Sequence, residues 1–303
     1  MMRRLTSFAL SMMFCLSVCA CYEPEAETPT RGKMRMPVSE SHAWLLEKEA
    51  QAFERLYPEA DITIVPMTTR EAIVELLNDS TGVICVDRAL NVEEQAAAQT
   101  AGLRITDTKI AQDALAIIVH AQNPVQNLAL GTLAEVVAGQ KTSWKELAGS
   151  KGLGRIEVAL TGRNSGVYEL LVLHFLRLSQ EPAVAFVAKT QREVVQYVST
   201  HPAAIGAVSV AALQDSIPNV RALALAPTDT TVKQPFVKLH QANIYRGWYP
   251  LHYPVYTFMT AELGSLASGF TAFVARAPGQ KIILDAKLVP ATMPVRLVQL
   301  TEN

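Results

Sequence analysis

The chain has 303 residues, of which 50% are hydrophobic and 18% are charged. This composition supports a real hydrophobic core and excludes a mostly disordered chain. The length suits one large domain or two lobes of ordinary size, and the formal net charge of −1 provides no basic footprint for nucleic acid.

The N-terminus has the pattern of an export signal. A short basic start precedes an apolar run at residues 5–18, which is too short to span a bilayer comfortably. The small residue Ala20 precedes Cys21, as in a bacterial lipoprotein signal, where the cysteine sulfur carries the lipid after cleavage. We therefore expect a signal peptide at 1–20 and a polar tether at 21–32, with the protein exported, lipid-anchored and facing the periplasm. A plain secretory peptide and an uncleaved anchor are the alternatives.

Strands that end in polar loops and lead into helices recur in the first part of the chain. Apolar runs at about 34–38, 61–65 and 82–86 predict the strands, and a helical pattern follows each of them. Because ligands bind at the carboxyl ends of strands in open α/β sheets, we expect the three loops to meet at one edge. The polar residues in these loops are Ser41 and His42, Thr68 and Thr69, and Asp87 and Arg88.

The middle of the chain continues the alternation of strands and helices, which predicts an α/β fold. An apolar run at 111–120 predicts a further strand. The stretch from Thr132 to Glu135 predicts a capping box, Gly139 predicts the end of that helix, and Thr190 predicts the cap of a later one. The remaining predicted elements are strands at about 204–210, 222–225, 253–259 and 295–300 and helices at about 263–275 and 280–286.

The loop at 162–166 is the strongest candidate for binding an anion. It joins a strand at 156–160 to a helical pattern, so the first N–H groups of the helix and its positive dipole end point at the loop. Ser165 adds a hydroxyl, Asn164 an amide and Arg163 a forked cation that suits oxyanions. The alternative is that Ser165 only caps the helix and Arg163 is solvated.

Sequence motifs for catalysis, metals and cofactors are missing. There is no Gly-x-Ser-x-Gly elbow, P-loop or dinucleotide fingerprint, and the six histidines show no metal-ligand spacing. His174 lies on the apolar side of its predicted helix, so we interpret it as a core residue. Helix N-termini, hydroxyl groups, Arg163 and Asp87 remain, which indicates binding of a ligand rather than catalysis.

Two regions resemble the periplasmic phosphate-binding proteins of ABC importers, in the lipoprotein form common in Bacteroidetes. They are residues 263–298 and residues 128–147, where Gly139 and Trp144 have the spacing of that family. The resemblance covers nearly the whole chain after the tether.

The resemblance implies a two-lobed α/β fold of the type II periplasmic binding class, in which each lobe is a mixed sheet flanked by helices and the ligand lies in the cleft between them. Lobe one would be 33–119 plus 232–303, and lobe two 120–231. The implied ligand is inorganic phosphate and the implied partners are the permease subunits of an ABC importer. The resemblance implies no enzymatic activity and no cofactor or metal.

The resemblance also implies a set of phosphate-binding residues. We add Asn164 to this set because its side-chain amide can donate to an anion. Asp87 would accept a hydrogen bond only from an oxyanion that still carries a proton, which hydrogen phosphate does and sulfate does not. The implied residues are Ser41 and the N–H of His42, Thr68 and Thr69, Asp87 and Arg88, and Arg163, Ser165, Gly166 and Val167.

Two departures from the family pattern affect this set. Val167 stands where the family has a hydroxyl residue, and losing a hydrogen bond to a charged group costs about 1.5–3 kcal/mol. Arg163 lies closer to Ser165 than the family's spacing has it. The alternatives are a surface or sensory lipoprotein that binds another oxyanion or a protein, and an exported hydrolase of phosphate esters.

Overall fold

The structure is a computed structural model, and it describes residues 26–147, 153–213, 218–226 and 236–292. The expected signal peptide, the expected lipidation site Cys21 and the predicted strand at 295–300 lie outside these residues. Within these ranges, no helix is both long enough and apolar enough to cross a membrane.

The strands predicted within these residues are confirmed, although the one predicted at 222–225 is divided into two short strands. Three further short strands, Asn127–Ala129, Phe186–Ala188 and Val289–Pro290, were not predicted. A separate pair consists of β5 (Asn127–Ala129) and β10 (Ala224–Ala226). The main sheet contains β1 (Gly32–Ser39), β2 (Ala60–Met67), β3 (Val83–Val86), β4 (Thr106–His120), β6 (Glu157–Thr161), β7 (Phe186–Ala188), β8 (Ala204–Ser209), β9 (Val220–Ala222), β11 (His252–Met259) and β12 (Val289–Pro290).

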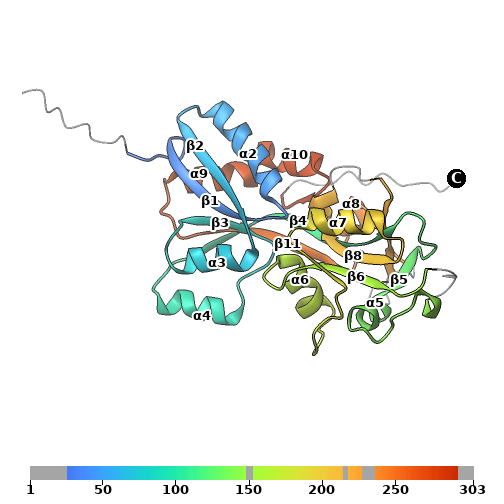
Figure 1. Ribbon diagram of the computed structural model, residues 1–303. Helices are drawn as coiled ribbons and strands as arrows, with labels where there is room; N and C mark the ends of the chain where they lie inside the picture. Colours follow the sequence, from blue (N-terminus) through green and yellow to red (C-terminus); the bar gives the residue numbers. More distant parts are fainter. Residues whose placement is uncertain (1–25, 148–152, 214–217, 227–235, 293–303) are drawn as a thin grey trace, which may run out of the picture.

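The main sheet is mixed and runs through the whole molecule (Figure 1). Its strand order is β2-β1-β3-β11-β4-β8-β6-β7, and β9 and β12 also pair with β4. The strands β1, β2 and β3 are parallel to one another, whereas β11 is antiparallel to both β3 and β4. The predicted α/β class is therefore confirmed.

Helices cover both faces of this sheet (Figure 1), so strands such as β3 and β8 are buried along their whole length. Helices α2, α9 and α10 lie over one face of the first part of the sheet, and α3 and α4 lie under the other. The helices are α2 (Ala43–Leu56), α3 (Thr69–Leu77), α4 (Val92–Thr100), α5 (Leu130–Val137), α6 (Gly166–Tyr168), α7 (Gln191–Thr200), α8 (Gln241–Tyr245), α9 (Leu266–Ala275) and α10 (Ala277–Asp285), with the short helices η1 (Trp144–Glu146), η2 (Glu169–Phe175) and η3 (Val210–Leu213).

Strand β4 belongs to two groups of strands. Its residues from Thr106 to Ala114 pair with β11, and those from Leu115 to Val119 pair with β8. We call β1, β2, β3 and β11 with their helices the first half of the sheet, and β6, β7 and β8 with theirs the second half. The predicted strand at 111–120 is confirmed, and it starts earlier than predicted because Thr106 already pairs with Met259.

Two local predictions turn out differently, and a third is confirmed. The expected capping box at Thr132 is wrong, because α5 already begins at Leu130 and Thr132 lies inside it. The helix that follows Ser165 widens into the π-helix η2, and this change of register leaves His174 exposed instead of in the core. Gly139 is confirmed at the end of α5, where it has a φ of 73° and its N–H donates to Val136 at 3.0 Å.

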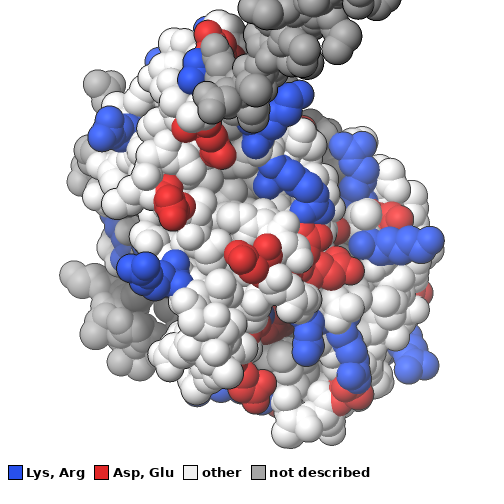
Figure 2. Space-filling model, turned by 90° about the vertical axis from the view of Figure 1, so that its left-hand side faces the viewer, with Lys and Arg blue, Asp and Glu red and all other residues white. Residues whose placement is uncertain are grey.

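Charged side chains of both signs are mixed over the face that Figure 2 shows, and neither sign dominates it. Ion pairs of the protein include Lys33 with Asp61 at 2.9 Å and Arg35 with Glu75. Since exposed pairs of this kind contribute little to stability, the fold depends on its buried apolar residues.

One buried group in this core is a carboxyl. The side chain of Glu49 on α2 is 0% exposed, and neither of its oxygens has a hydrogen-bond partner. Desolvation by burial raises the pKa of Glu49 to about 9. The carboxyl is therefore protonated in the folded protein at neutral pH.

Replacing Glu49 with Met should make stability less dependent on pH. The folded-state pKa of about 9 lies above the ordinary value of 4.5, so folding loses about 1.4 kcal/mol for each pH unit between these values. Between pH 5 and pH 8, the free energy of unfolding should fall by about 3–4 kcal/mol more in the wild type than in Glu49→Met. Urea denaturation at both pH values measures this difference.

The control is Glu47→Met, which changes an exposed residue of the same helix. Its pH dependence should match that of the wild type. If Glu49→Met also keeps the wild-type pH dependence, Glu49 is not held in its protonated form by the fold.

Candidate functional site

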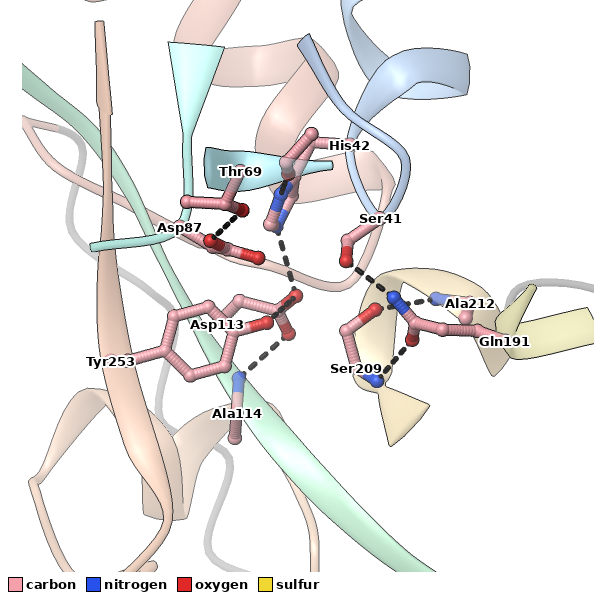
Figure 3. A network of polar contacts seen from close by, with 11 residues as sticks. Ser41, His42, Thr69, Asp87, Asp113, Ala114, Gln191, Ser209, Ala212 and Tyr253 are labelled. Carbon is pink, nitrogen blue, oxygen red and sulfur yellow. Dashed lines mark hydrogen bonds and ion pairs between the residues drawn. The ribbon is translucent and has the colours of Figure 1, made fainter. Parts of the chain in front are cut away.

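The carboxylate of Asp87 forms the centre of a polar cluster at the carboxyl end of β3. Its side chain is 1% exposed. The hydroxyl of Thr69, at the start of α3, donates to Asp87 Oδ1 at 2.6 Å, whereas Asp87 Oδ2 is buried and has no hydrogen-bond partner among the described residues (Figure 3). Burying a carboxylate oxygen without a hydrogen-bond donor costs free energy of folding. A ligand that donates a hydrogen bond to this oxygen would offset that cost.

The start of α6, in the second half of the sheet, lies directly against this carboxylate. A Cβ atom built on Gly166 would lie 2.1 Å from Asp87 Oδ2, so only glycine permits this approach. Helix α6 continues without a break into η2, and its first N–H groups have no carbonyl partner inside the helix. The two halves of the sheet thus bring a carboxylate and a helix N-terminus together.

A second contact joins the two halves through Gln191, the first residue of α7. Its Nε2 donates to Ser41 Oγ in the loop between β1 and α2, and its Oε1 accepts from the backbone N–H of Ser209 at 2.7 Å (Figure 3). Burial raises the pKa of Glu40, the residue before Ser41, while hydrogen bonding by Gln191 lowers it and the nearby Asp87 raises it further. Glu40 and Ser41 therefore both meet the start of α7.

A buried network supports the loop that carries Ser41. His42 Nε2 lies 3.0 Å from Asp113 Oδ2 on β4, and Tyr253 on β11 donates to the same oxygen at 3.0 Å (Figure 3). Since a carboxylate only accepts, the Nε2 of His42 carries the proton in this pair. Burial and the Asp113 charge raise the pKa of Tyr253 far above its usual range, so its hydroxyl stays a donor.

This network contains the residue types of a hydrolytic triad, but a substrate cannot reach its serine. Ser39 Oγ lies 3.1 Å from His42 Nδ1, and His42 in turn contacts Asp113. The side chains of Ser39, His42 and Asp113 are 2%, 0% and 0% exposed, so no substrate reaches the hydroxyl. The arrangement braces the loop against the sheet.

The structure brings some of the predicted site residues into this cluster. Ser165 is buried, and its Oγ accepts from Thr161 at 2.8 Å. The side chain of Val167 is 0% exposed and packs in the core, so only its backbone can face a ligand. The N–H of His42, expected as a ligand donor, donates instead to Ser39 at 2.9 Å.

Other predicted residues lie outside the cluster. Thr68 caps α3 in a capping box with Glu71, and Asn164 is exposed. Arg163 is exposed and forms an ion pair with Glu181. These three residues are therefore exposed or paired with other residues in this structure.

Arg88 does not point at Asp87 either. Its guanidinium pairs with Glu94 at 2.7 Å and with Glu169 at 2.9 Å. Glu94 belongs to α4 in the first half of the sheet, and Glu169 begins η2 in the second half, so Arg88 joins the two halves. A cavity of about 480 Å³ lies beside this ion pair and reaches Asp87 and Tyr253.

Three residues of the cluster were missed by the sequence analysis. Asp113 lies in an apolar run and Tyr253 in an irregular aromatic group, and nothing in their spacing links them to His42. Gln191 does have a signal, because β7 leads into α7 as the other strands lead into their helices. Applying the rule of strand, loop and helix to this junction would have identified it.

The chemistry available here is the binding of an oxyanion. Hydroxyl groups and a helix N-terminus provide hydrogen-bond donors, and Asp87 provides an acceptor. Within the described ranges, no group of three or more His, Cys, Asp and Glu side chains could hold a metal ion.

Comparison with known proteins identifies relatives of this architecture. The family model described as "PBP superfamily domain" matches residues 23–277. The phosphate-binding protein PstS of Pseudomonas aeruginosa is 26% identical over 290 residues, which cover 88% of this chain and 85% of that protein.

Two solved structures share the fold. A phosphate ABC transporter substrate-binding protein from Clostridium perfringens, described as putative and solved with bound phosphate, has a TM-score of 0.74 and 22% identity; the match covers 86% of this chain and 100% of that chain. An ABC-type phosphate transport receptor from Vibrio cholerae has a TM-score of 0.68 and 20% identity, with the same coverage.

Removing the Asp113 carboxylate should destabilise the protein strongly. In Asp113→Ala, the donors of His42 and Tyr253 and the N–H of Ala114, which donates to Asp113 Oδ1 at 2.7 Å, lose their acceptor. We expect a loss of about 3–5 kcal/mol in the free energy of unfolding, because three buried donors lose their acceptor and each unsatisfied group costs about 1–3 kcal/mol. Urea denaturation at neutral pH measures it.

Asp107→Ala serves as the control, because Asp107 is an exposed residue of the same strand. It should change stability by less than about 0.5 kcal/mol. An Asp113→Ala protein as stable as this control would show that the network does not support the loop.

Proposed function

The chain belongs to the PBP superfamily domain family, and on this premise we propose that it is an extracytoplasmic solute-binding protein that captures inorganic phosphate and delivers it to an ABC importer. It acts as a receptor rather than as an enzyme. The names of its relatives support this proposal, since PstS of Pseudomonas aeruginosa is a phosphate-binding protein and the Clostridium perfringens structure contains phosphate.

The observation that carries the proposal is the unpartnered Oδ2 of Asp87. This oxygen accepts a hydrogen bond from an anion that carries a proton and repels one that does not. Hydrogen phosphate has such a proton at neutral pH, whereas sulfate is fully deprotonated. The start of α6 then supplies donors for the remaining phosphate oxygens.

We assign the binding role to the residues that lie in the cluster. The donors are the hydroxyls of Ser41 and Ser165 and the N–H groups of Gly166 and Val167. Thr69 donates its only hydroxyl hydrogen to Asp87 Oδ1, so its role is to hold the Asp87 carboxylate in place. Val167 offers no side-chain donor, so its contribution is limited to the backbone.

Capture requires that the two halves of the sheet separate and close. We propose lobe one as residues 33–119 plus 232–303 and lobe two as residues 120–231, with β4 as a hinge strand. The contacts of Arg88 with Glu169 and of Ser41 with Gln191 join the halves in the closed form. Opening breaks these contacts and exposes Asp87.

The placement in the cell follows from the N-terminal pattern. We propose that Cys21 carries a lipid that holds the protein at the membrane, facing the periplasm, and that permease subunits receive the phosphate. Globomycin-treated cells should then accumulate the uncleaved precursor, which gel mobility detects. A Cys21→Ser protein should leave the membrane fraction or remain uncleaved, and unchanged membrane attachment and processing would contradict the proposal.

Calorimetry on protein stripped of ligand by unfolding and refolding tests the binding proposal. The wild type should bind phosphate and show no heat with sulfate. In Asp87→Asn, phosphate affinity should fall about ten- to a hundredfold and sulfate should begin to bind, because an amide can donate to sulfate.

Asp107→Asn is the matched control, because it removes an exposed carboxylate from β4 and should bind like the wild type. No heat with phosphate would contradict the proposed function. Wild-type protein that binds sulfate as tightly as phosphate would contradict the role of Asp87.

A further inference from the structure

The orientation of the Gln191 amide is determined by its surroundings. The backbone N–H of Ser209 can only donate, so the amide atom that it meets at 2.7 Å is the oxygen Oε1. The nitrogen Nε2 therefore faces the hydroxyl of Ser41. Gln191 is 4% exposed, which leaves its side chain little room for another arrangement.

This orientation constrains the hydroxyl of Ser41. An amide nitrogen only donates, so the Ser41 oxygen is the acceptor in this hydrogen bond. The hydrogen of the Ser41 hydroxyl must then point to a different acceptor, and no hydrogen bond among the described residues uses it as a donor. Ser41 is 4% exposed and lies in the cluster around Asp87 (Figure 3).

The contact also depends on the conformation of the whole protein. Ser41 follows β1 in the first half of the sheet, and Gln191 opens α7 in the second half. When the halves separate, Gln191 keeps its bond to Ser209, which lies in its own half, but loses Ser41. The Ser41 hydroxyl is then free to donate to any neighbour, including water.

We propose that Gln191 is a positioning residue. When the protein closes, Gln191 donates to the Ser41 oxygen and so orients the Ser41 hydroxyl to donate to the bound oxyanion. This inference rests on the proposed function and adds a residue from the β7–α7 junction to it. The ligand does not need to touch Gln191. Closure and hydrogen bonding to the anion are coupled, because the same contact that joins the halves also orients the donor.

A purely structural role for Gln191 makes a different prediction. Its bond to Ser209 could simply hold the end of β8, where Ser209 Oγ also accepts from Ala212 at 3.2 Å. Removing Gln191 would then weaken phosphate binding independently of Ser41. A double-mutant cycle between Ser41 and Gln191 separates the two roles.

The experiment compares phosphate affinity, measured by calorimetry, in the wild type, Ser41→Ala, Gln191→Met and the double variant. Ser41→Ala should weaken binding about ten- to a hundredfold. Gln191→Met should weaken it about three- to tenfold, and the double variant should match Ser41→Ala within about twofold, since Gln191 acts through Ser41.

Gln196→Met, at an exposed position of the same helix, is the control and should bind like the wild type. If Gln191→Met does not fold, Gln191→Glu takes its place in the cycle, because it keeps an acceptor for Ser209 and removes the donor to Ser41. Thermal unfolding of every variant shows whether the fold is retained.

Two results would overturn the inference while leaving phosphate binding by the wild type intact. One is a loss of affinity in the double variant equal to the product of the losses in the two single variants, and the other is an unchanged affinity in Gln191→Met. If the wild type itself gives no heat with phosphate, the proposed function fails and the inference falls with it. The wild-type titration therefore distinguishes the two failures.

Discussion

The buried carboxylate of Asp87 is the constraint around which the site is arranged. One of its oxygens is held by Thr69, and the other has no partner, although the residue is 1% exposed. Leaving a charged oxygen unpaired in the interior costs more than the 1–3 kcal/mol typical of a neutral group, roughly several kcal/mol. A ligand that brings its own proton would remove this cost, and for this reason the preference for protonated oxyanions that we propose rests on the same atom.

The Asp87 carboxylate lies between a part of the sheet that holds it in place and a helix N-terminus from the other half. Asp87 ends a strand of the first half of the sheet, where the buried network of Asp113 fixes the neighbouring loop to β4 and β11. The second half approaches through Gly166 and is joined by side-chain contacts of Gln191 and Glu169. These are a few side-chain contacts, whereas one buried apolar cluster extends from β1 to β6 and β4 runs continuously through both halves. In the opening and closing that we propose, a fixed acceptor meets a helix N-terminus that moves toward it, which suits capture and release.

Local sequence patterns predicted the longer strands and most helices, because hydrophobic periodicity and caps depend on neighbouring residues, but they missed the short strands β5, β7 and β12. They also located Asp87 and Thr69, since the ends of parallel strands meet at one edge. They failed where packing between distant segments decides. The packing of β4 and α7 against other elements places Asp113 and Gln191 at the site. Arg163 instead pairs with Glu181. The π-helix that exposes His174 has no signal in the pattern of apolar residues.

A high-resolution crystal structure of the protein with phosphate tests the central role of Asp87 most directly. The distance between Asp87 Oδ2 and the nearest phosphate oxygen decides the question. A distance of about 2.5–2.7 Å, with the remaining oxygens at the start of α6, is the result expected for a charge-assisted hydrogen bond. Phosphate bound elsewhere, or an Oδ2 atom that still lacks a ligand partner when phosphate fills the site, would contradict it.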